Sequence, residues 1–161
     1  MIEYRTRGEF MEDKYYSQIK DLIVDTETTI KVKDYSKNKK ILDNNYEIGK
    51  ILVEAQGGES RAKYGDKLIL KYSRKLTKEL GKGYSTRTLK DMRKFYLFQK
   101  RHALRAQLSW TNYRELLSLK DDNEIEYYMG LAIKNNLTYR QLHEKINLMN
   151  TKNYLSIQNK N

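Results

Sequence analysis

Apolar residues recur every three or four positions along most of the chain, which is the spacing of one buried face of an α-helix. The clearest case spans residues 66–80. The positions on its apolar face are Leu68, Ile69, Tyr72, Leu76 and Leu80. Basic and polar residues fill the opposite side, so we expect an amphipathic helix over this segment.

A short turn and a second helix are predicted directly after this segment. The run Gly81-Lys82-Gly83 ends the first helix, because glycine adopts the left-handed cap conformation at little cost. Ser85 is a candidate N-cap for the next helix, since its hydroxyl can accept a hydrogen bond from a free backbone N–H. Leu89 and Met92 then mark a second apolar face. The two segments predict a pair that resembles a helix-turn-helix.

The remaining apolar pattern predicts further helices and an all-α fold of about six to seven helices. They are expected over about 11–31 and 35–56, from Ser109 or Thr111, from Asp121 or Asp122 to about 134, and after Thr138. Residues 102–108 are read as a short helix or connector. The chain has no proline and is rich in helix-forming residues, which favours the same class. Gly49 lies inside a predicted helix, where glycine often allows a neighbouring helix to approach closely.

The domain organisation follows from length and composition. With 161 residues the chain is long enough for one packed domain, and no internal repeat or linker divides it. We expect a flexible lead-in over 1–10, a single helical domain over 11–150 and a flexible tail over 151–161. The sequence has no cysteine, no apolar run of membrane-spanning length and no signal-peptide core, so a cytoplasmic protein is expected.

Positive charge is concentrated in the centre of the chain. The formal net charge is +11, yet residues 1–60 carry ten Lys/Arg against twelve Asp/Glu. Residues 61–105 carry fifteen against three, and residues 106–161 carry seven against six. Such a field attracts polyanions, of which nucleic acid is the commonest. An anionic membrane is the competing target, but the helices lack the Trp/Phe-rich face of interfacial helices.

The central cations align along the two predicted helices. Lys67, Lys71, Arg74 and Lys78 form one stripe on the first helix. The second helix carries a basic face made of Arg87, Lys90, Lys94 and Arg101. Aligned basic stripes on a helix-turn-helix-like pair are what DNA binding requires. The alternative is that these stripes are only solvated helix faces, which are common in helical proteins.

Catalytic chemistry is not indicated by the residues. His102 and His143 lie far apart in sequence, and no cysteine or acidic cluster stands near them at metal-ligand spacing. Acidic residues around 121–126 mark a helix start, where carboxylates favour the helix dipole. Gly81-Lys82-Gly83 lacks the spacing of a phosphate-binding loop. We therefore expect a chain that is not an enzyme by itself and that holds no metal or cofactor.

Several blocks of sequence resemble the N-terminal domain of the YhcG-like nuclease family. The blocks, in order, are 46–50 (YEIGK), 61–65 (RAKYG), 76–85 (LTKELGKGYS), 89–96 (LKDMRKFY), 108–117 (LSWTNYRELL) and 142–147 (LHEKIN). The resemblance covers roughly residues 15–147 and implies a helical DNA-binding domain, usually followed in the family by a PD-(D/E)xK nuclease domain. This sequence shows no such acidic and Glu-x-Lys motif, since the segment 47–50 has the wrong spacing and lies on a predicted helix. The family's hydrolytic activity is therefore not carried over.

Two hypotheses follow for the basic segment. In the first it binds nucleic acid, most favourably double-stranded DNA. The second helix would supply Ser85, Arg87, Lys90, Arg93, Lys94 and Arg101, with Arg87 contacting a base edge or the minor groove. Phosphate contacts would come from Lys67, Lys71, Arg74, Lys78 and Lys82. In the second hypothesis the chain is a protein-interaction module, such as an adaptor for a nuclease or a phage or mobile-element inhibitor of a nucleoprotein complex. A homodimer is left open, although no heptad seam is evident.

Overall fold

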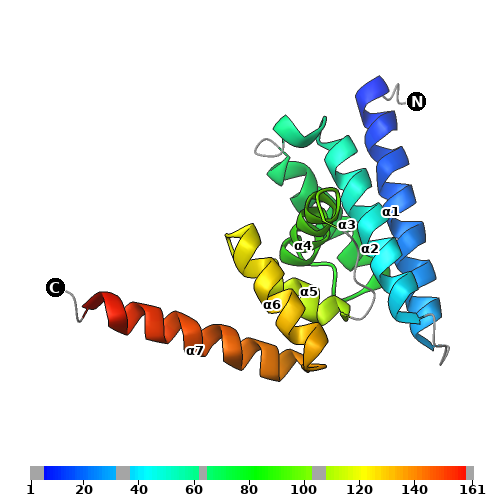
Figure 1. Ribbon diagram of the computed structural model, residues 1–161. Coiled ribbons are helices and arrows are strands. Elements are labelled where there is room, and N and C mark those ends of the chain that lie inside the picture. The colour runs from blue at the N-terminus through cyan, green and yellow to red at the C-terminus, as the bar shows by residue number, and fades with distance from the viewer. Residues whose placement is uncertain (1–5, 32–36, 62–64, 103–107, 159–161) are drawn as a thin grey trace. The chain divides into compact units, whose positions relative to one another are not determined.

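The computed structural model describes residues 6–31, 37–61, 65–102 and 108–158, and within them it contains seven α-helices, one short 3-10 helix and no strand (Figure 1). The helices are α1 (Arg7–Lys31), α2 (Lys37–Ala55), α3 (Asp66–Leu80), α4 (Thr86–Gln99), α5 (Trp110–Leu116), α6 (Asp122–Lys134) and α7 (Tyr139–Gln158). The 3-10 helix is η1 (Glu59–Arg61). The predicted all-α class is confirmed.

Contacts within the chain group the residues into two compact units. Unit 1 comprises residues 1–104 with α1 to α4, and unit 2 comprises residues 105–161 with α5 to α7. The predicted division into a lead-in, a single domain and a tail stays a prediction. Helical backbone extends into both predicted ends, because α1 begins at Arg7 and α7 ends at Gln158. Most of the predicted connector 102–108 lies outside the described residues.

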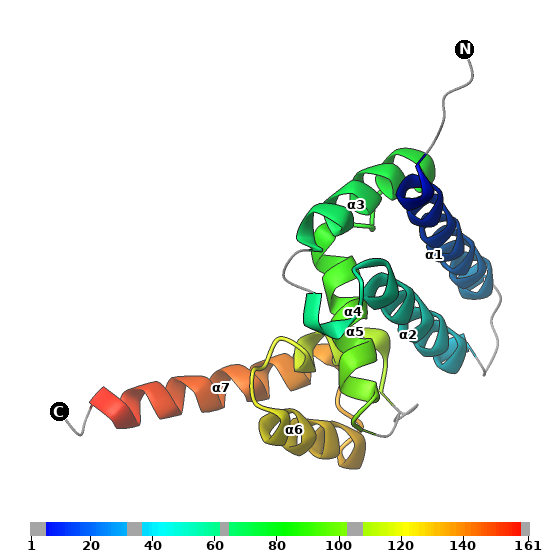
Figure 2. The ribbon, with the colours of Figure 1, turned by 90° about the horizontal axis from the view of Figure 1, so that it is seen from above.

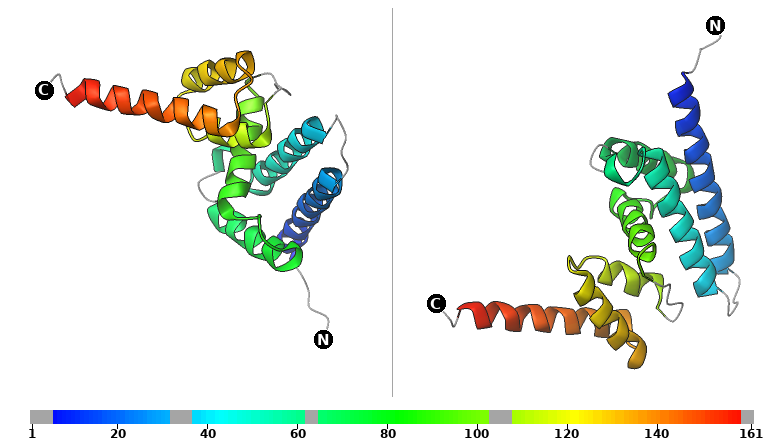
Figure 3. Two further views of the ribbon diagram at one scale, coloured as in Figure 1. Left: turned by 90° about the horizontal axis from the view of Figure 1, so that it is seen from below. Right: turned by 45° about the horizontal axis from the view of Figure 1, so that its top comes forward.

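Unit 1 is built on α2. Helices α1 and α2 lie side by side, and α4 packs against α2 (Figures 2 and 3). The fully buried side chains at these contacts include Ile19, Leu42, Ile48, Leu52 and Phe95. Burying each large aliphatic side chain contributes about 1.5–3 kcal/mol, so this core is the main source of the stability of unit 1.

Gly49 marks a close approach between α2 and α4. A Cβ atom added to Gly49 of α2 would lie 2.1 Å from the backbone oxygen of Met92 in α4. No side chain fits there without moving one helix, because the obstacle is backbone. The expectation that this mid-helix glycine admits a neighbouring helix is therefore confirmed.

The three helices of unit 2 begin at caps that the sequence predicted. The hydroxyl of Ser109 accepts the N–H of Asn112 at 3.2 Å and caps α5. Asp121 caps α6 by accepting the N–H of Asn123 and that of Glu124. The hydroxyl of Thr138 accepts the N–H of Gln141 in the first turn of α7. The core beneath these caps includes Tyr113, Leu116, Ile125, Met129, Leu142 and Ile146.

Candidate nucleic-acid interface

The first predicted helix has the bounds and the two faces that its sequence indicated. Helix α3 buries Ile69, Tyr72 and Leu76. On its opposite side all four members of the predicted stripe are exposed, namely Lys67, Lys71, Arg74 and Lys78. The buried apolar face fixes the rotation of the helix, and this rotation presents the stripe to solvent.

The turn between α3 and α4 depends on two glycines. Gly81 has φ of 96°, and its N–H donates to the carbonyl of Thr77 at 3.0 Å. Gly83 has φ of 115°, which also favours a residue without Cβ. Between them Lys82 is exposed. The turn therefore ends α3 at the predicted position and leaves a lysine at its outer surface, but ψ of −156° places Gly81 outside the left-handed helical region that the cap prediction assumed.

Ser85 begins α4 as predicted. Its hydroxyl accepts the backbone N–H of Thr88 at 3.2 Å and lies 3.1 Å from the Thr88 hydroxyl. Arg87, in the first turn, and Lys94, two turns further on, are exposed, while Lys90 and Arg93 are half-buried. The Nε atom of Arg93 is covered and has no hydrogen-bond partner among the described residues. Arg101 is exposed beyond the end of α4 and already takes part in an interaction within the protein.

Two of the predicted contact residues are paired with carboxylates of the same chain. The ammonium group of Lys71 pairs with the carboxylate of Glu12 in α1. This hydrogen bond raises the pKa of Lys71, and the nearby charges of Asp13 and Glu9 act in the same direction. The Nζ atom of Lys90 lies 3.0 Å from Oδ2 of Asp66 at the start of α3. Their positive charges are therefore partly balanced within unit 1.

Further intramolecular pairs involve residues that the sequence did not single out. Lys75 of α3 lies 3.7 Å from the carboxylate of Asp13, and its Nζ is 4.2 Å from the ring centre of Tyr16. Lys100 pairs with Glu59 of η1 at 2.5 Å. These partners come from segments that are distant in sequence, so helix periodicity carried no signal for them.

Six other cations among the predicted contact residues are exposed and form no ion pair with a described residue. We call these residues the open cations: Lys67, Arg74, Lys78, Lys82, Arg87 and Lys94. They lie along α3 from its first turn, at the glycine turn and on α4. Their side chains can meet an external anion without first breaking an internal ion pair.

Both histidines contact neighbouring side chains. The ring of His102 stacks on Phe98, with 4.2 Å between the ring centres. Nδ1 of His143 lies 2.7 Å from the Glu115 carboxylate, and its Nε2 lies 2.9 Å from the amide nitrogen of Asn147. Because an amide nitrogen only donates, Nε2 accepts and Nδ1–H donates to Glu115. Across the part of the chain that the structure describes, no three His, Asp or Glu side chains are grouped as metal ligands would be.

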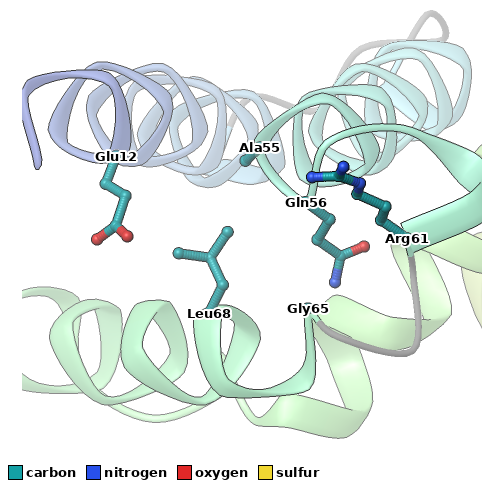
Figure 4. A pocket seen from close by; sticks show the side chains of 6 residues that line it. All are labelled: Glu12, Ala55, Gln56, Arg61, Gly65 and Leu68. Atoms are coloured by element: carbon teal, nitrogen blue, oxygen red, sulfur yellow. The ribbon is translucent and has the colours of Figure 1, made fainter. Parts of the chain in front are cut away.

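A hollow of about 510 Å³ lies between α1, the end of α2 and the start of α3 (Figure 4). Its lining includes Glu12, Gln56, Arg61 and Leu68. Gln56 is 8% exposed, and within the part of the chain that the structure describes neither polar atom of its amide has a hydrogen-bond partner. The amide lies against Gly65, where a Cβ would approach it to 2.3 Å. No sequence pattern indicated this hollow, since its lining residues are spread over four elements.

Comparisons with known proteins agree with the resemblance seen in the sequence. Over 85 residues, or 52% of this chain, the sequence is 38% identical to the "Putative nuclease YhcG" of Escherichia coli (strain K12). The match covers 23% of that relative, so the aligned part of this chain spans about a quarter of the relative's length. No solved structure matches the chain.

The family of the chain is established by a match over most of its length. Among the described residues no helix is both long and apolar enough to cross a bilayer. Residues 18–153 match the family described as the DUF1016 N-terminal domain, and no catalytic domain is evident within residues 1–161. This result confirms the predicted relation to an N-terminal domain of YhcG-like nucleases. The chain belongs to the DUF1016 N-terminal domain family.

Proposed function

We propose that this chain is a nucleic-acid-binding module that engages double-stranded DNA through the open cations of α3 and α4. The proposal rests on six exposed cations between residues 67 and 94 that have no carboxylate partner among the described residues. Basic side chains without a carboxylate partner repel one another. The approach of an external polyanion lowers their electrostatic free energy and so favours binding. The relation to a protein named as a nuclease supports nucleic acid as that polyanion.

The residues of this surface fit different roles. Arg87 lies in the first turn of α4, is exposed, and carries the planar fork that can hydrogen-bond a guanine edge at two atoms. The lysines and Arg74 along α3 and the turn fit phosphate contacts, which position a protein without reading sequence. Ser85 already caps α4, so its hydroxyl has a structural role that DNA contact would supplement.

We further propose that the module is not a nuclease by itself. Hydrolysis by a PD-(D/E)xK centre needs several carboxylates around a metal ion, and the sequence lacks that motif. A highly purified preparation is expected to leave supercoiled plasmid intact in the presence of Mg²⁺ or Mn²⁺. Cleavage that copurifies with the chain and disappears with chelator would contradict this expectation.

The binding proposal is tested by fluorescence-anisotropy titration with duplex DNA, single-stranded DNA and RNA at several salt concentrations. The Arg87→Ala/Lys94→Ala variant should bind duplex DNA at least about tenfold more weakly, because one bidentate base contact alone contributes about 1–3 kcal/mol. Its melting temperature should stay unchanged, since both side chains are exposed and unpaired among the described residues.

A matched control removes the same charge from unit 2. Arg140 and Lys145 are exposed on α7 and form no ion pair with a described residue. The Arg140→Ala/Lys145→Ala variant should retain the affinity of the parent chain. Equal affinity of all three proteins for duplex DNA would refute the assignment of the surface.

A second candidate function is protein interaction, either with a nuclease or with a nucleoprotein complex. The observation that favours it is the exposure of two adjacent apolar residues on α7, Leu148 at 60% and Met149 at 43%. Exposed apolar residues of this size are typical of protein contacts when they form a contiguous patch. The test is light scattering after size exclusion. Self-association that Leu148→Lys/Met149→Lys abolishes would support an interface on α7, and a monomer at all concentrations would argue against a homodimer.

A further inference from the structure

Helix α1 matches the charges of α3 along one edge of that helix. Near its N-terminal end, α1 sets Glu12 against Lys71 and Asp13 against Lys75. About two turns further along α1, the signs are reversed, and Lys20 of α1 pairs with Glu79 of α3. Acidic residues of α1 thus face the basic part of α3, and a basic residue faces the acidic part.

Packing holds this edge in place, so the ion pairs are not incidental. The hydroxyl of Tyr72 donates to the backbone oxygen of Glu12 at 2.8 Å. The rings of Tyr16 and Tyr72 lie 5.7 Å apart and are both buried. These contacts bring the first half of α1 alongside α3 and keep two carboxylates within reach of Lys71 and Lys75.

The carboxylates occupy the place that phosphates would take at a basic helix. A carboxylate and a phosphate oxygen satisfy a lysine ammonium in the same manner. Glu12 and Asp13 are about 39% exposed, so they also place negative charge at the surface that a DNA backbone would have to approach. Like charges that face one another across such an interface disfavour association.

We infer that the acidic edge of α1, formed by Glu12 and Asp13, acts as an internal phosphate mimic that limits the DNA footprint to the open cations. Lys71 and Lys75 then anchor α1 and do not contact DNA. The backbone of the nucleic acid follows Arg74, Lys78 and the glycine turn towards Arg87. This inference rests on the proposed function, because it assigns the extent of the same surface.

The carboxylates of the acidic edge compete only weakly with DNA for Lys71 and Lys75. Neutralising them should therefore change the DNA affinity by a measurable amount. Exposed ion pairs of this kind are weak, because water screens both charges. Neutralising Glu12 and Asp13 releases two lysines and removes two repelling charges. The Glu12→Gln/Asp13→Asn variant should therefore bind duplex DNA about three- to tenfold more tightly at low salt. Two added phosphate contacts should steepen the slope of log K against log salt by about 2.

The control variant changes the net charge equally at another place in unit 1. Asp21 of α1 and Glu54 of α2 are exposed and form no ion pair with a described residue. The Asp21→Asn/Glu54→Gln variant should keep the parent salt slope. If both variants gain affinity equally, the gain reflects net charge alone and the inference is overturned. Thermal unfolding of each variant confirms that the fold is retained.

A second pair of variants tests the footprint without touching α1. Lys71→Ala/Lys75→Ala should change affinity by less than about twofold, whereas Arg74→Ala/Lys78→Ala should weaken it about tenfold through lost phosphate contacts. Equal losses in the two variants would overturn the inference while leaving the proposed function intact. Absence of nucleic-acid binding by the parent chain and every variant would overturn the proposed function, and this inference with it.

Discussion

Gly49 of unit 1 and Gly130 of unit 2 each lie in the interior of a helix, α2 and α6 respectively. Their surroundings differ. A Cβ on Gly49 would collide with the backbone of α4, whereas a Cβ on Gly130 would meet no described atom within 4 Å. A mid-helix glycine lowers helix stability in both places, but only at Gly49 does close packing compensate. The same sequence signal therefore has a tertiary cause in unit 1 and no visible cause in unit 2.

The polar contacts of the two units differ less than their glycines do, because each unit has both local and long-range ones. Unit 1 is tied by contacts between residues far apart in the chain, such as Glu12 with Lys71 and Asn44 with Asp25. In unit 2 three caps act within one helical turn, at Ser109, Asp121 and Thr138, and Glu115 of α5 also pairs with His143 of α7. Local contacts form as soon as a helix forms, whereas the long-range contacts need the assembled helices.

The largest effect is expected from filling the contact at Gly49. Gly49→Ala forces α2 and α4 apart, which should lower the free energy of unfolding by about 1–3 kcal/mol as overpacking does. The melting temperature, followed by circular dichroism at 222 nm, should fall by roughly 3–10 °C. An unchanged melting temperature would show that the two helices separate freely and that Gly49 is no different from Gly130.

The opposite sign is expected at Gly130. Gly130→Ala adds a methyl group in open space and reduces the conformational freedom of the unfolded chain. Stability should rise by about 0.5–1 kcal/mol, the usual gain from alanine over glycine within a helix. The same thermal melt measures it. A loss of stability would reveal a contact around α6 that the described residues do not show.

The smallest effect concerns the polar link between α1 and α2. A hydrogen bond from Asn44 at 2.8 Å, together with Lys40 at 2.9 Å, lowers the pKa of Asp25 from its ordinary value of 3.8. A depressed pKa means that the stabilisation is present above pH 3.8 and is lost as pH falls through the lower folded value. Asp25→Asn should therefore melt below the parent at pH 7, and the gap should close towards pH 2.

Asp21→Asn serves as the reference for this titration, because Asp21 is exposed on the same helix without an ion pair to a described residue. Its melting temperature should follow that of the parent across the pH range. A gap for Asp25→Asn that persists at pH 2 would mean that the side-chain amide disturbs packing and that the carboxylate charge has no part in the link.

Much of the candidate interface could be predicted from sequence. The bounds of α3, the cap at Ser85 and the exposure of Arg74, Lys78 and Arg87 all follow from local spacing and capping rules. The ion pairs that Lys71 and Lys90 form with carboxylates could not be predicted from the sequence. Their partners, Glu12 and Asp66, are set by how α1 and α4 pack against α3, and helix periodicity holds no information on that packing.

The sequence by itself determined the helical class, the positions of the turns and caps, and the concentration of positive charge in residues 61–105. Each of these depends on residues within one or two helical turns, where spacing, capping and composition act directly. Only the tertiary structure decided which cations are free to meet an anion, why Gly49 is glycine, and where the Gln56 hollow lies. Those features depend on contacts between segments that are distant along the chain, and such contacts are fixed by the joint packing of the helices.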